Sequence, residues 1–176
     1  MLKEGDKAPA FELVSDAGQT VRLSDFAGKK LVLYFYPRDN TPGCTREAIA
    51  FSESVKRIAA AGASVVGVSR DSVKSHGSFR DKHALKIPLL SDPDLVVQRA
   101  FGAWGDKTMY GKKVEGTIRS TFVIGPDGTI AKAFPSVKVD GHVDQVLAAL
   151  GAGDAGPAQK VEAKAAPAKK VPAKKR

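Results

Sequence analysis

A strand-to-helix junction that holds the one cysteine of the chain constrains the fold more than any other feature. Residues 31–36 form an uninterrupted apolar run, which predicts a buried strand. Residues 44–61 then repeat apolar side chains at helical spacing, with Thr41 placed as the N-cap and Pro42 at the first helical position. Cys44 therefore falls in the first turn of a helix, where unpaired backbone N–H groups and the helix dipole favour a thiolate anion.

The rest of the chain alternates strand and helix patterns up to about residue 150. The patterns predict strands at 64–69 and 88–90, helices at 72–83, 95–101 and 140–150, and hairpins pairing 11–14 with 20–23 and 121–124 with 129–134. This is the order of a thioredoxin-like α/β domain, a mixed central sheet with helices on both faces. We therefore expect one domain over residues 1–150.

Composition limits the setting in which such a domain works. A chain of 176 residues, 43% of them apolar, is long enough to bury a sizeable core. One cysteine cannot form an internal disulfide, which excludes a disulfide-stapled secreted domain. The N-terminus shows no signal-peptide pattern, and no apolar stretch approaches the roughly 20 residues of a membrane helix. These observations predict a cytoplasmic protein without a membrane contact.

The C-terminal segment, residues 151–176, differs sharply in composition. It is rich in Ala, Lys and Pro and lacks aromatic side chains, so we expect a disordered basic tail. Residues 152–176 hold seven basic and two acidic side chains, more than half of the formal net charge of +9. Lysines of this kind bind phosphates without sequence preference. The tail is therefore either a solvated segment without a partner or a weak, nonspecific nucleic-acid contact through residues 160–176.

Cys44 has two interpretations when it is taken alone. It shares a helical stripe with Ala48, Phe51 and Val55, which suits a small buried side chain. Its neighbours favour chemistry, because Pro37-x3-Thr41-x2-Cys44 matches the Pro-x3-Thr/Ser-x2-Cys motif of the peroxiredoxins. The sequence context of Cys44 therefore favours a reactive thiol over a packing residue.

The resemblance extends along residues 1 to about 150. Residues 5–11, 34–45, 88–92, 104–112 and 119–124 are each similar, in the same order, to segments of the bacterioferritin comigratory protein (Bcp), or peroxiredoxin Q, branch. The resemblance implies a thiol peroxidase that reduces hydrogen peroxide and organic hydroperoxides, needs no cofactor and takes part in antioxidant defence. It also implies a monomer.

The same resemblance assigns roles to four residues. Cys44 would be the peroxidatic thiolate, Thr41 would hydrogen-bond the peroxide, and Pro37 would shield the sulfur from bulk water. Arg119 would stabilise the thiolate and orient the peroxide through its fork of donors. Without the family match, Arg119 is better interpreted as a solvated charge at a strand end.

Other polar residues receive weaker interpretations. Glu47, one turn after Cys44, either orients an arginine or is an exposed helix carboxylate, and the sequence favours exposure. His76, His83 and His142 do not have the spacing of a zinc site, so we interpret them as surface or packing residues and expect no metal.

The chain departs from its family where a second cysteine would stand. Ile49 and Arg80 occupy the two positions at which members of the branch carry a resolving cysteine. We therefore expect a one-cysteine cycle in which an outside thiol resolves the sulfenic acid. Thioredoxin, glutaredoxin with glutathione and a small thiol are all open as the reductant.

Two readings from other functional classes stay open at this point. One is a thioredoxin-fold binding or chaperone-like module that lost turnover together with its resolving cysteine. The other is a nucleic-acid-associated protein whose basic tail is the functional part. Peroxide consumption that depends on Cys44 separates the peroxidase from the first, and DNA binding that depends on the tail tests the second.

Overall fold

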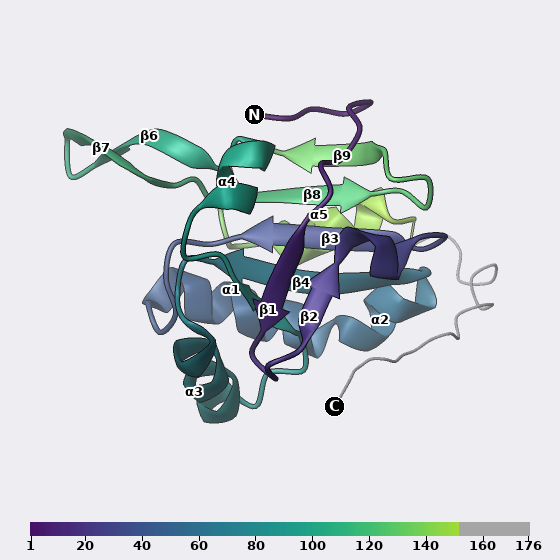
Figure 1. Ribbon diagram of the computed structural model, residues 1–176, viewed down its shortest axis with the longest axis horizontal. Coiled ribbons are helices and arrows are strands. Elements are labelled where there is room, and N and C mark those ends of the chain that lie inside the picture. Colours follow the sequence, from purple (N-terminus) through teal and green to yellow (C-terminus); the bar gives the residue numbers. More distant parts are fainter. Residues whose placement is uncertain (152–176) are drawn as a thin grey trace.

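The computed structural model describes residues 1–151, so the tail predicted for residues 151–176 lies outside them except for Gly151. Its main sheet has seven strands in the order β2-β1-β5-β4-β3-β8-β9 (Figure 1). Strands β3, β4 and β5 run parallel, and the other neighbours pair antiparallel, so the sheet is mixed as predicted. The strands are β1 Glu12–Ser15, β2 Thr20–Arg22, β3 Lys30–Phe35, β4 Ala63–Ser69, β5 Leu89–Ser91, β8 Ser120–Ile124 and β9 Ile130–Phe134.

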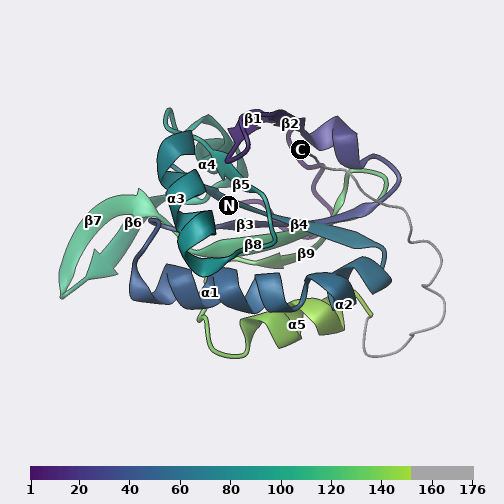
Figure 2. The same ribbon diagram turned by 90° about the horizontal axis from the view of Figure 1, so that it is seen from below.

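Helices lie on both faces of this sheet, which confirms the predicted layering. Figure 2 shows α1, α2 and α5 side by side along one face, with α4 on the opposite side. The helices are α1 Pro42–Glu53, α2 Val55–Ala60, α3 Val73–His83, α4 Val96–Phe101 and α5 His142–Ala149, and Leu23–Phe26 forms a short 3-10 helix, η1. None of the helices within residues 1–151 combines the length and the apolar character needed to cross a bilayer.

Strand β3 and the residue after it explain the uninterrupted apolar run. Val32, Tyr34 and Tyr36 belong to the core cluster that includes side chains of α1, α2 and α5. Leu31, Leu33 and Phe35 belong to the cluster on the other face, with side chains of α4. All six are at most 1% exposed, so alternate side chains of one strand fill two separate cores.

Helix α1 begins where the sequence predicts and ends earlier. Thr41 is the N-cap with an extended backbone, and Pro42 occupies the first turn. The predicted helix over 44–61 is wrong in one respect, because it is interrupted at Ser54, with φ −103° and ψ 5°. The Ser54 N–H bonds to the Phe51 carbonyl instead of one four residues back, which closes α1 before α2 begins.

A second, two-stranded sheet has no counterpart in the sequence analysis. Strands β6 (Trp104–Met109) and β7 (Lys112–Thr117) form a hairpin that projects from the body of the protein (Figure 1). Tyr110 and Gly111 at its turn both have positive φ, 53° and 79°, as a tight hairpin turn with primed geometry requires. The end of β7 leads directly to Arg119 and β8.

Candidate active site

Cys44 lies buried in the first turn of α1, with only 1% of its surface exposed. The first helical hydrogen bond runs from the Thr45 N–H to the Thr41 carbonyl, at 2.9 Å. The N–H groups of Gly43 and Cys44 precede that bond and have no acceptor within the helix. The sulfur thus lies at the positive end of α1, an environment that favours an anion.

Arg119, which is far from Cys44 in the sequence, places a cation beside the sulfur. Its Nη2 donates to Cys44 Sγ at 3.4 Å, although 75 positions separate the two residues. A Cβ on Gly43 would lie 3.2 Å from the same Nη2, so glycine at this position leaves room for the guanidinium. Burial disfavours the Arg119 charge, but Glu47 and Cys44 outweigh it and raise the pKa of Arg119 above its usual value.

Glu47 is the site residue that the sequence analysis misplaced. It is fully buried, not exposed, and its Oε1 accepts from Arg119 Nη1 at 2.6 Å. The helical period explains this position, because Glu47 is one turn after Cys44 and one turn before Phe51, on the face that packs against the sheet. Burial raises the pKa of Glu47 to about 7, while Arg119 acts in the opposite direction.

Thr41 and Pro37 lie in the loop that joins β3 to α1. The Thr41 hydroxyl donates to the Arg38 carbonyl at 2.9 Å, within that loop. Within residues 1–151, the recorded hydrogen bond of the Cys44 sulfur is the one from Arg119. The structure therefore joins Cys44, Arg119 and Glu47 by hydrogen bonds, while the hydroxyl of Thr41 bonds within its own loop.

The buried carboxylate of Asp39 anchors this loop through hydrogen bonds. Asp39 Oδ1 accepts from the Tyr36 hydroxyl at 2.7 Å, and Oδ2 contacts the Ser75 hydroxyl at 2.7 Å and His76 Nδ1 at 2.8 Å. Burial raises the pKa of Asp39, but the bonds from His76, Tyr36 and Ser75 prevail and lower it. Asp39 thereby ties the active-site loop to α3.

The other end of that network reaches the sheet. His76 Nε2 lies 3.0 Å from the Leu90 carbonyl, and the Asp39 N–H donates to Asp71 Oδ2 at 2.8 Å. Adjacent Asn40 has a left-handed backbone, with φ 64°. These contacts hold a strained turn in place immediately before Thr41.

Asp39, Asp71 and His76 also lie close enough together to hold a metal ion. Their facing atoms are already used, because Asp39 Oδ2 contacts Ser75 and His76 while Asp71 Oδ2 accepts from the Asp39 N–H and from Ser69. The donor set therefore fits a hydrogen-bonding network better than a cation site. Of the other histidines, His142 lies 2.8 Å from the Thr121 hydroxyl, and burial lowers its pKa.

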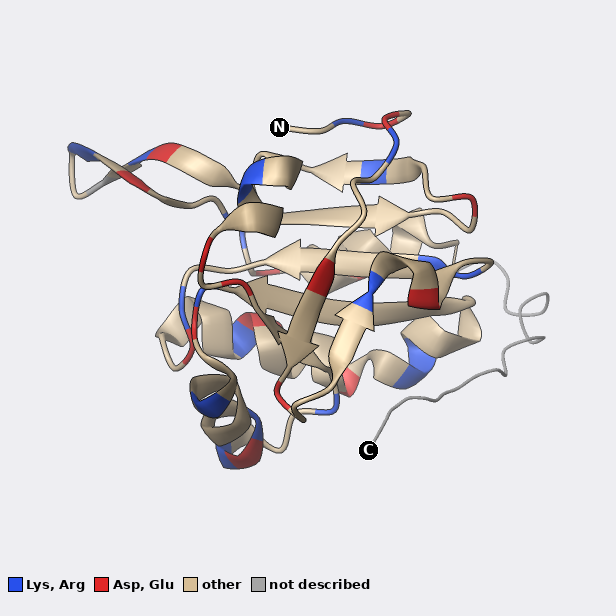
Figure 3. Ribbon diagram, viewed as in Figure 1, with Lys and Arg blue, Asp and Glu red and all other residues tan. Residues whose placement is uncertain are grey.

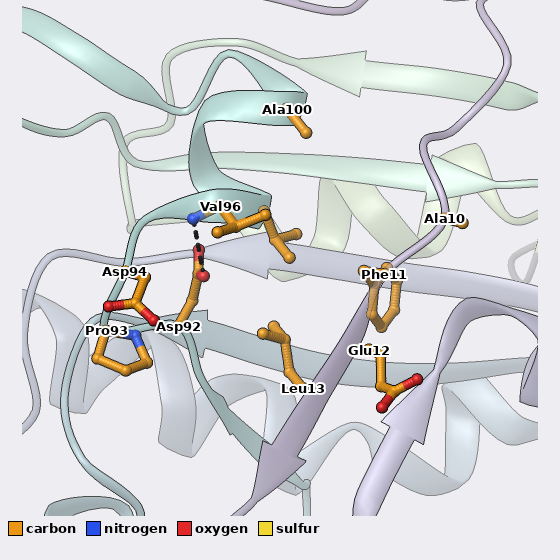
Figure 4. Close-up of a pocket in the computed structure, with 10 residues that line it drawn as sticks. Ala10, Phe11, Glu12, Leu13, Asp92, Pro93, Asp94, Val96 and Ala100 are labelled. Atoms are coloured by element: carbon orange, nitrogen blue, oxygen red, sulfur yellow. Dashed lines mark hydrogen bonds between the residues drawn. The ribbon is translucent and has the colours of Figure 1, made fainter.

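A surface groove of about 290 Å³ lies apart from these residues, between the start of β1 and the beginning of α4 (Figure 4). Its walls are apolar at Phe11, Leu13 and Val97. The carboxylate of Asp92 accepts from the N–H groups of Val96 and Gln98 and so caps α4. The lining offers no thiol, hydroxyl, imidazole or cation, so the candidate chemistry remains at Cys44.

Comparison with known proteins agrees with this geometry. A family model described as the AhpC/TSA family matches residues 4–133. Peroxiredoxin Bcp of Bacillus subtilis is 47% identical over 149 residues, 85% of this chain and 95% of that protein.

Solved structures show the same relationship. A structure of Xanthomonas campestris peroxiredoxin Q has a TM-score of 0.76 and 48% identity, and covers 81% of this chain and 90% of its own. A cysteine-to-serine mutant of Xylella fastidiosa peroxiredoxin Q has a TM-score of 0.82 and 42% identity, with coverage of 88% and 99%. The predicted thioredoxin-like fold is confirmed, and the chain belongs to the AhpC/TSA family of peroxiredoxins, in the Bcp or peroxiredoxin Q branch.

Proposed function

We propose that this thiol peroxidase reduces hydrogen peroxide and organic hydroperoxides through a sulfenic acid at Cys44. The observation that carries the proposal is the contact between Cys44 Sγ and Arg119 Nη2 at 3.4 Å, in the first turn of α1. A cation and a helix N-terminus on one sulfur favour the thiolate, which is the nucleophilic form. A relative of this branch, the Xanthomonas campestris bacterioferritin comigratory protein, is described as having alkyl peroxide reduction activity.

The first half of the cycle oxidises the sulfur. The Cys44 thiolate attacks the terminal, protonated oxygen of ROOH, so that an S–O bond forms and the O–O bond breaks. The sulfur loses two electrons and becomes the sulfenic acid, and the leaving RO⁻ takes a proton from the medium to give ROH. Hydrogen peroxide gives water in the same step.

Four residues assist this displacement in the proposed mechanism. Arg119 stabilises the thiolate and the charge that develops on the leaving oxygen, while Glu47 holds the guanidinium in place at 2.6 Å. The Thr41 hydroxyl exchanges its bond with the Arg38 carbonyl for one with a peroxide oxygen. Pro37 shields the sulfur from bulk water.

The second half of the cycle needs a thiol from outside. The thiolate of a reductant attacks the sulfenic sulfur, an S–S bond forms and the S–O bond breaks, and the leaving hydroxide takes a proton from the medium to give water. A second reductant thiol then attacks the mixed disulfide, which releases the Cys44 thiolate and leaves the reductant as its disulfide. We propose thioredoxin, or glutaredoxin with glutathione, as this reductant.

The one-cysteine cycle follows from the residues at the resolving positions. In the Xanthomonas protein two cysteines were mutated to serine, and they lie as far apart in its sequence as Arg80 lies from Cys44. Here Arg80 Nη1 bonds to Asp16 at 2.6 Å, and its Nε donates to the Leu85 carbonyl at 3.3 Å. Arginine at this position anchors α3 to the β1–β2 hairpin in place of a second thiol.

We further propose that the protein works as a cytoplasmic monomer. The large apolar side chains that are exposed within residues 1–151 are few, and they come from separate elements, as Val14 in β1, Val96 in α4 and Tyr110 at the β6–β7 turn do. A single cysteine that must return to the thiol form suits a reducing compartment. Sedimentation of the reduced and the oxidised protein tests the monomer directly.

The basic tail carries a separate proposal, weak nonspecific binding of nucleic acid through residues 160–176. The test replaces the seven basic residues of this segment by glutamine in the full-length chain. Binding of duplex DNA at low salt should fall, and the dependence of binding on salt should become shallower. Equal DNA binding by the wild type and the variant would show that the tail is a solvated segment that does not bind nucleic acid.

The proposed function is tested by mixing the reduced protein with one equivalent of hydrogen peroxide. Trp104 fluorescence follows the reaction, and the intact mass should increase by one oxygen atom in the wild type but not in Cys44→Ser. A rate no greater than that of an ordinary free thiol would show that Cys44 is not activated. The binding-module alternative would then replace the peroxidase proposal.

A further inference from the structure

The three lysines of the β6–β7 hairpin are arranged in two different ways. Lys112 and Lys113 are exposed on β7 near the projecting turn, where Figure 3 shows basic residues at the tip of the hairpin. The Lys113 side chain is 78% exposed and lies 4.0 Å from Asp106. Lys107, on β6, folds back toward the body of the protein and is partly buried. A lysine that only kept the hairpin soluble would be exposed, so the partial burial of Lys107 indicates another role.

Lys107 is fixed by two contacts at the base of the hairpin. Its Nζ donates to the Thr117 carbonyl at 2.7 Å. Its aliphatic stem packs over Gly116, where an added Cβ would lie 3.3 Å from Lys107 Cε. The ammonium therefore binds the last residue of β7, two positions before Arg119.

The segment that accepts this bond, Thr117 and Ile118, also bonds to α4 and the residues after it. The Thr117 hydroxyl donates to Gln98 Oε1 at 2.5 Å, and the Ile118 N–H donates to the Ala103 carbonyl at 2.7 Å. Both partners belong to α4 or to the residues just after it. Lys107 and α4 thus hold, from two directions, the short connection that leads into Arg119.

The charge of Lys107 also reaches the site. Burial lowers the pKa of Lys107, the Arg119 cation lowers it further, and Cys44 raises it. The charge of Lys107 therefore interacts with that of Arg119 and with Cys44. Repulsion between Lys107 and Arg119 is unfavourable, and attraction to the Cys44 thiolate acts in the opposite direction.

We propose that Lys107 is a positioning residue for the peroxide reaction, which holds the segment carrying Arg119 through the Thr117 carbonyl and adds a second positive charge to the field around the Cys44 thiolate. The inference rests on the proposed roles of Cys44 and Arg119. It gives the projecting hairpin a part in the chemistry, because the hairpin carries Lys107 and its bond to Thr117.

The test compares Lys107→Met with Lys107→Arg and with Lys113→Met. Lys113→Met is the matched control, because it removes an equal charge from the same hairpin at an exposed position. Two readouts are followed against pH, the rate of Cys44 alkylation by iodoacetamide and the rate of oxidation by hydrogen peroxide. Melting temperatures show that each variant is folded.

Lys107→Met should slow both reactions at neutral pH by roughly threefold to tenfold, the size of one charge interaction near a protein surface. The alkylation curve should move to higher pH, and the alkylation rates should converge at alkaline pH, where the thiol is ionised in every variant. Lys107→Arg should restore the alkylation curve because it keeps the charge. Lys113→Met should behave as the wild type.

Two results would overturn the inference. Coincident alkylation curves for the wild type and Lys107→Met would show that the charge does not act on the sulfur. Equal slowing of alkylation at every pH, with a lower melting temperature, would show that Lys107 has only a structural role.

Glu47 and Tyr34 also face this site, and they remain unchanged in every variant. Failure of the proposed function itself is distinct, because the wild type would then react no faster than a free thiol.

Discussion

The carboxylate of Glu47 and the guanidinium of Arg119 meet at 2.6 Å, although 72 positions separate them in the sequence. The same guanidinium bonds to the Cys44 sulfur at 3.4 Å through its other terminal nitrogen. Arg119 thus connects two residues of one helical turn from outside the helix. In the proposed mechanism, the reactivity of the thiol depends on how firmly this guanidinium is held.

Arg119→Lys tests the fork directly. Lysine keeps the charge but has a single point of attachment, so it cannot bond the sulfur and Glu47 in the same geometry. We expect oxidation of Cys44 by hydrogen peroxide to slow roughly tenfold to hundredfold, the cost of one hydrogen bond to a charged group. Arg46→Lys is the control, because Arg46 makes an exposed pair with Asp140. A wild-type rate in Arg119→Lys would contradict the assigned role.

Gly43→Ala tests the space around the guanidinium. The new Cβ would lie 3.2 Å from Arg119 Nη2, so the arginine must move by a few tenths of an ångström away from the sulfur. We expect slower oxidation by peroxide with little loss of stability. Gly77→Ala in α3 is the matched control, since its Cβ comes no nearer than 3.9 Å to its neighbours, and it should raise the stability by up to about 1 kcal/mol. Equal oxidation rates in the two variants would contradict the prediction.

Glu47→Gln tests the pH dependence of stability. Burial raises the pKa of Glu47 from 4.5 to about 7, so the folded protein binds more protons than the unfolded chain between these values. The free energy of unfolding contributed by Glu47 therefore falls as pH rises through that window and stays low above it. Chemical denaturation at a series of pH values should show this decline in the wild type and not in Glu47→Gln. Parallel curves for the two proteins would contradict it.

Asp39→Asn tests the anchoring of the active-site loop. The substitution removes the charge that faces His76 and turns one acceptor into a donor, so we expect a loss of about 3 kcal/mol in the free energy of unfolding. Oxidation of Cys44 should also slow, because the turn before Thr41 is no longer held. Asp140→Asn is the control, since the Asp140 side chain is 90% exposed in its ion pair with Arg46, so the substitution should change neither quantity. Wild-type stability in Asp39→Asn would show that the network does not anchor the loop.

The features predicted from the sequence are those that short-range patterns determine. The apolar run in β3, the N-cap at Thr41 and the proline in the first turn fix where the helix with Cys44 begins. The mixed sheet and its helices followed from the order of such patterns along the chain. Strand ends differ from the predictions by only a residue or two.

The features that were missed depend on contacts between distant residues. Glu47 is charged, which favours exposure, and only its pairing with Arg119 makes burial tolerable. Asp39 and His76 are 37 positions apart, so nothing near either residue indicates their pairing. The β6–β7 hairpin projects from the body of the protein beyond its base, so its strands need no apolar alternation, and pairing between the two strands replaces that signal.

The long separation between Cys44 and Arg119 has a consequence for the order of folding. The guanidinium reaches the sulfur only after β8 has docked antiparallel beside β3, which closes a loop of more than 80 residues. Such distant pairings form late, because the entropy of loop closure opposes them. Until then the chain carries a cysteine without its cation. If Arg119 activates Cys44 as proposed, a nascent or partly folded molecule meets peroxide with an unactivated thiol, and reactivity is a property that the protein acquires on completing its fold.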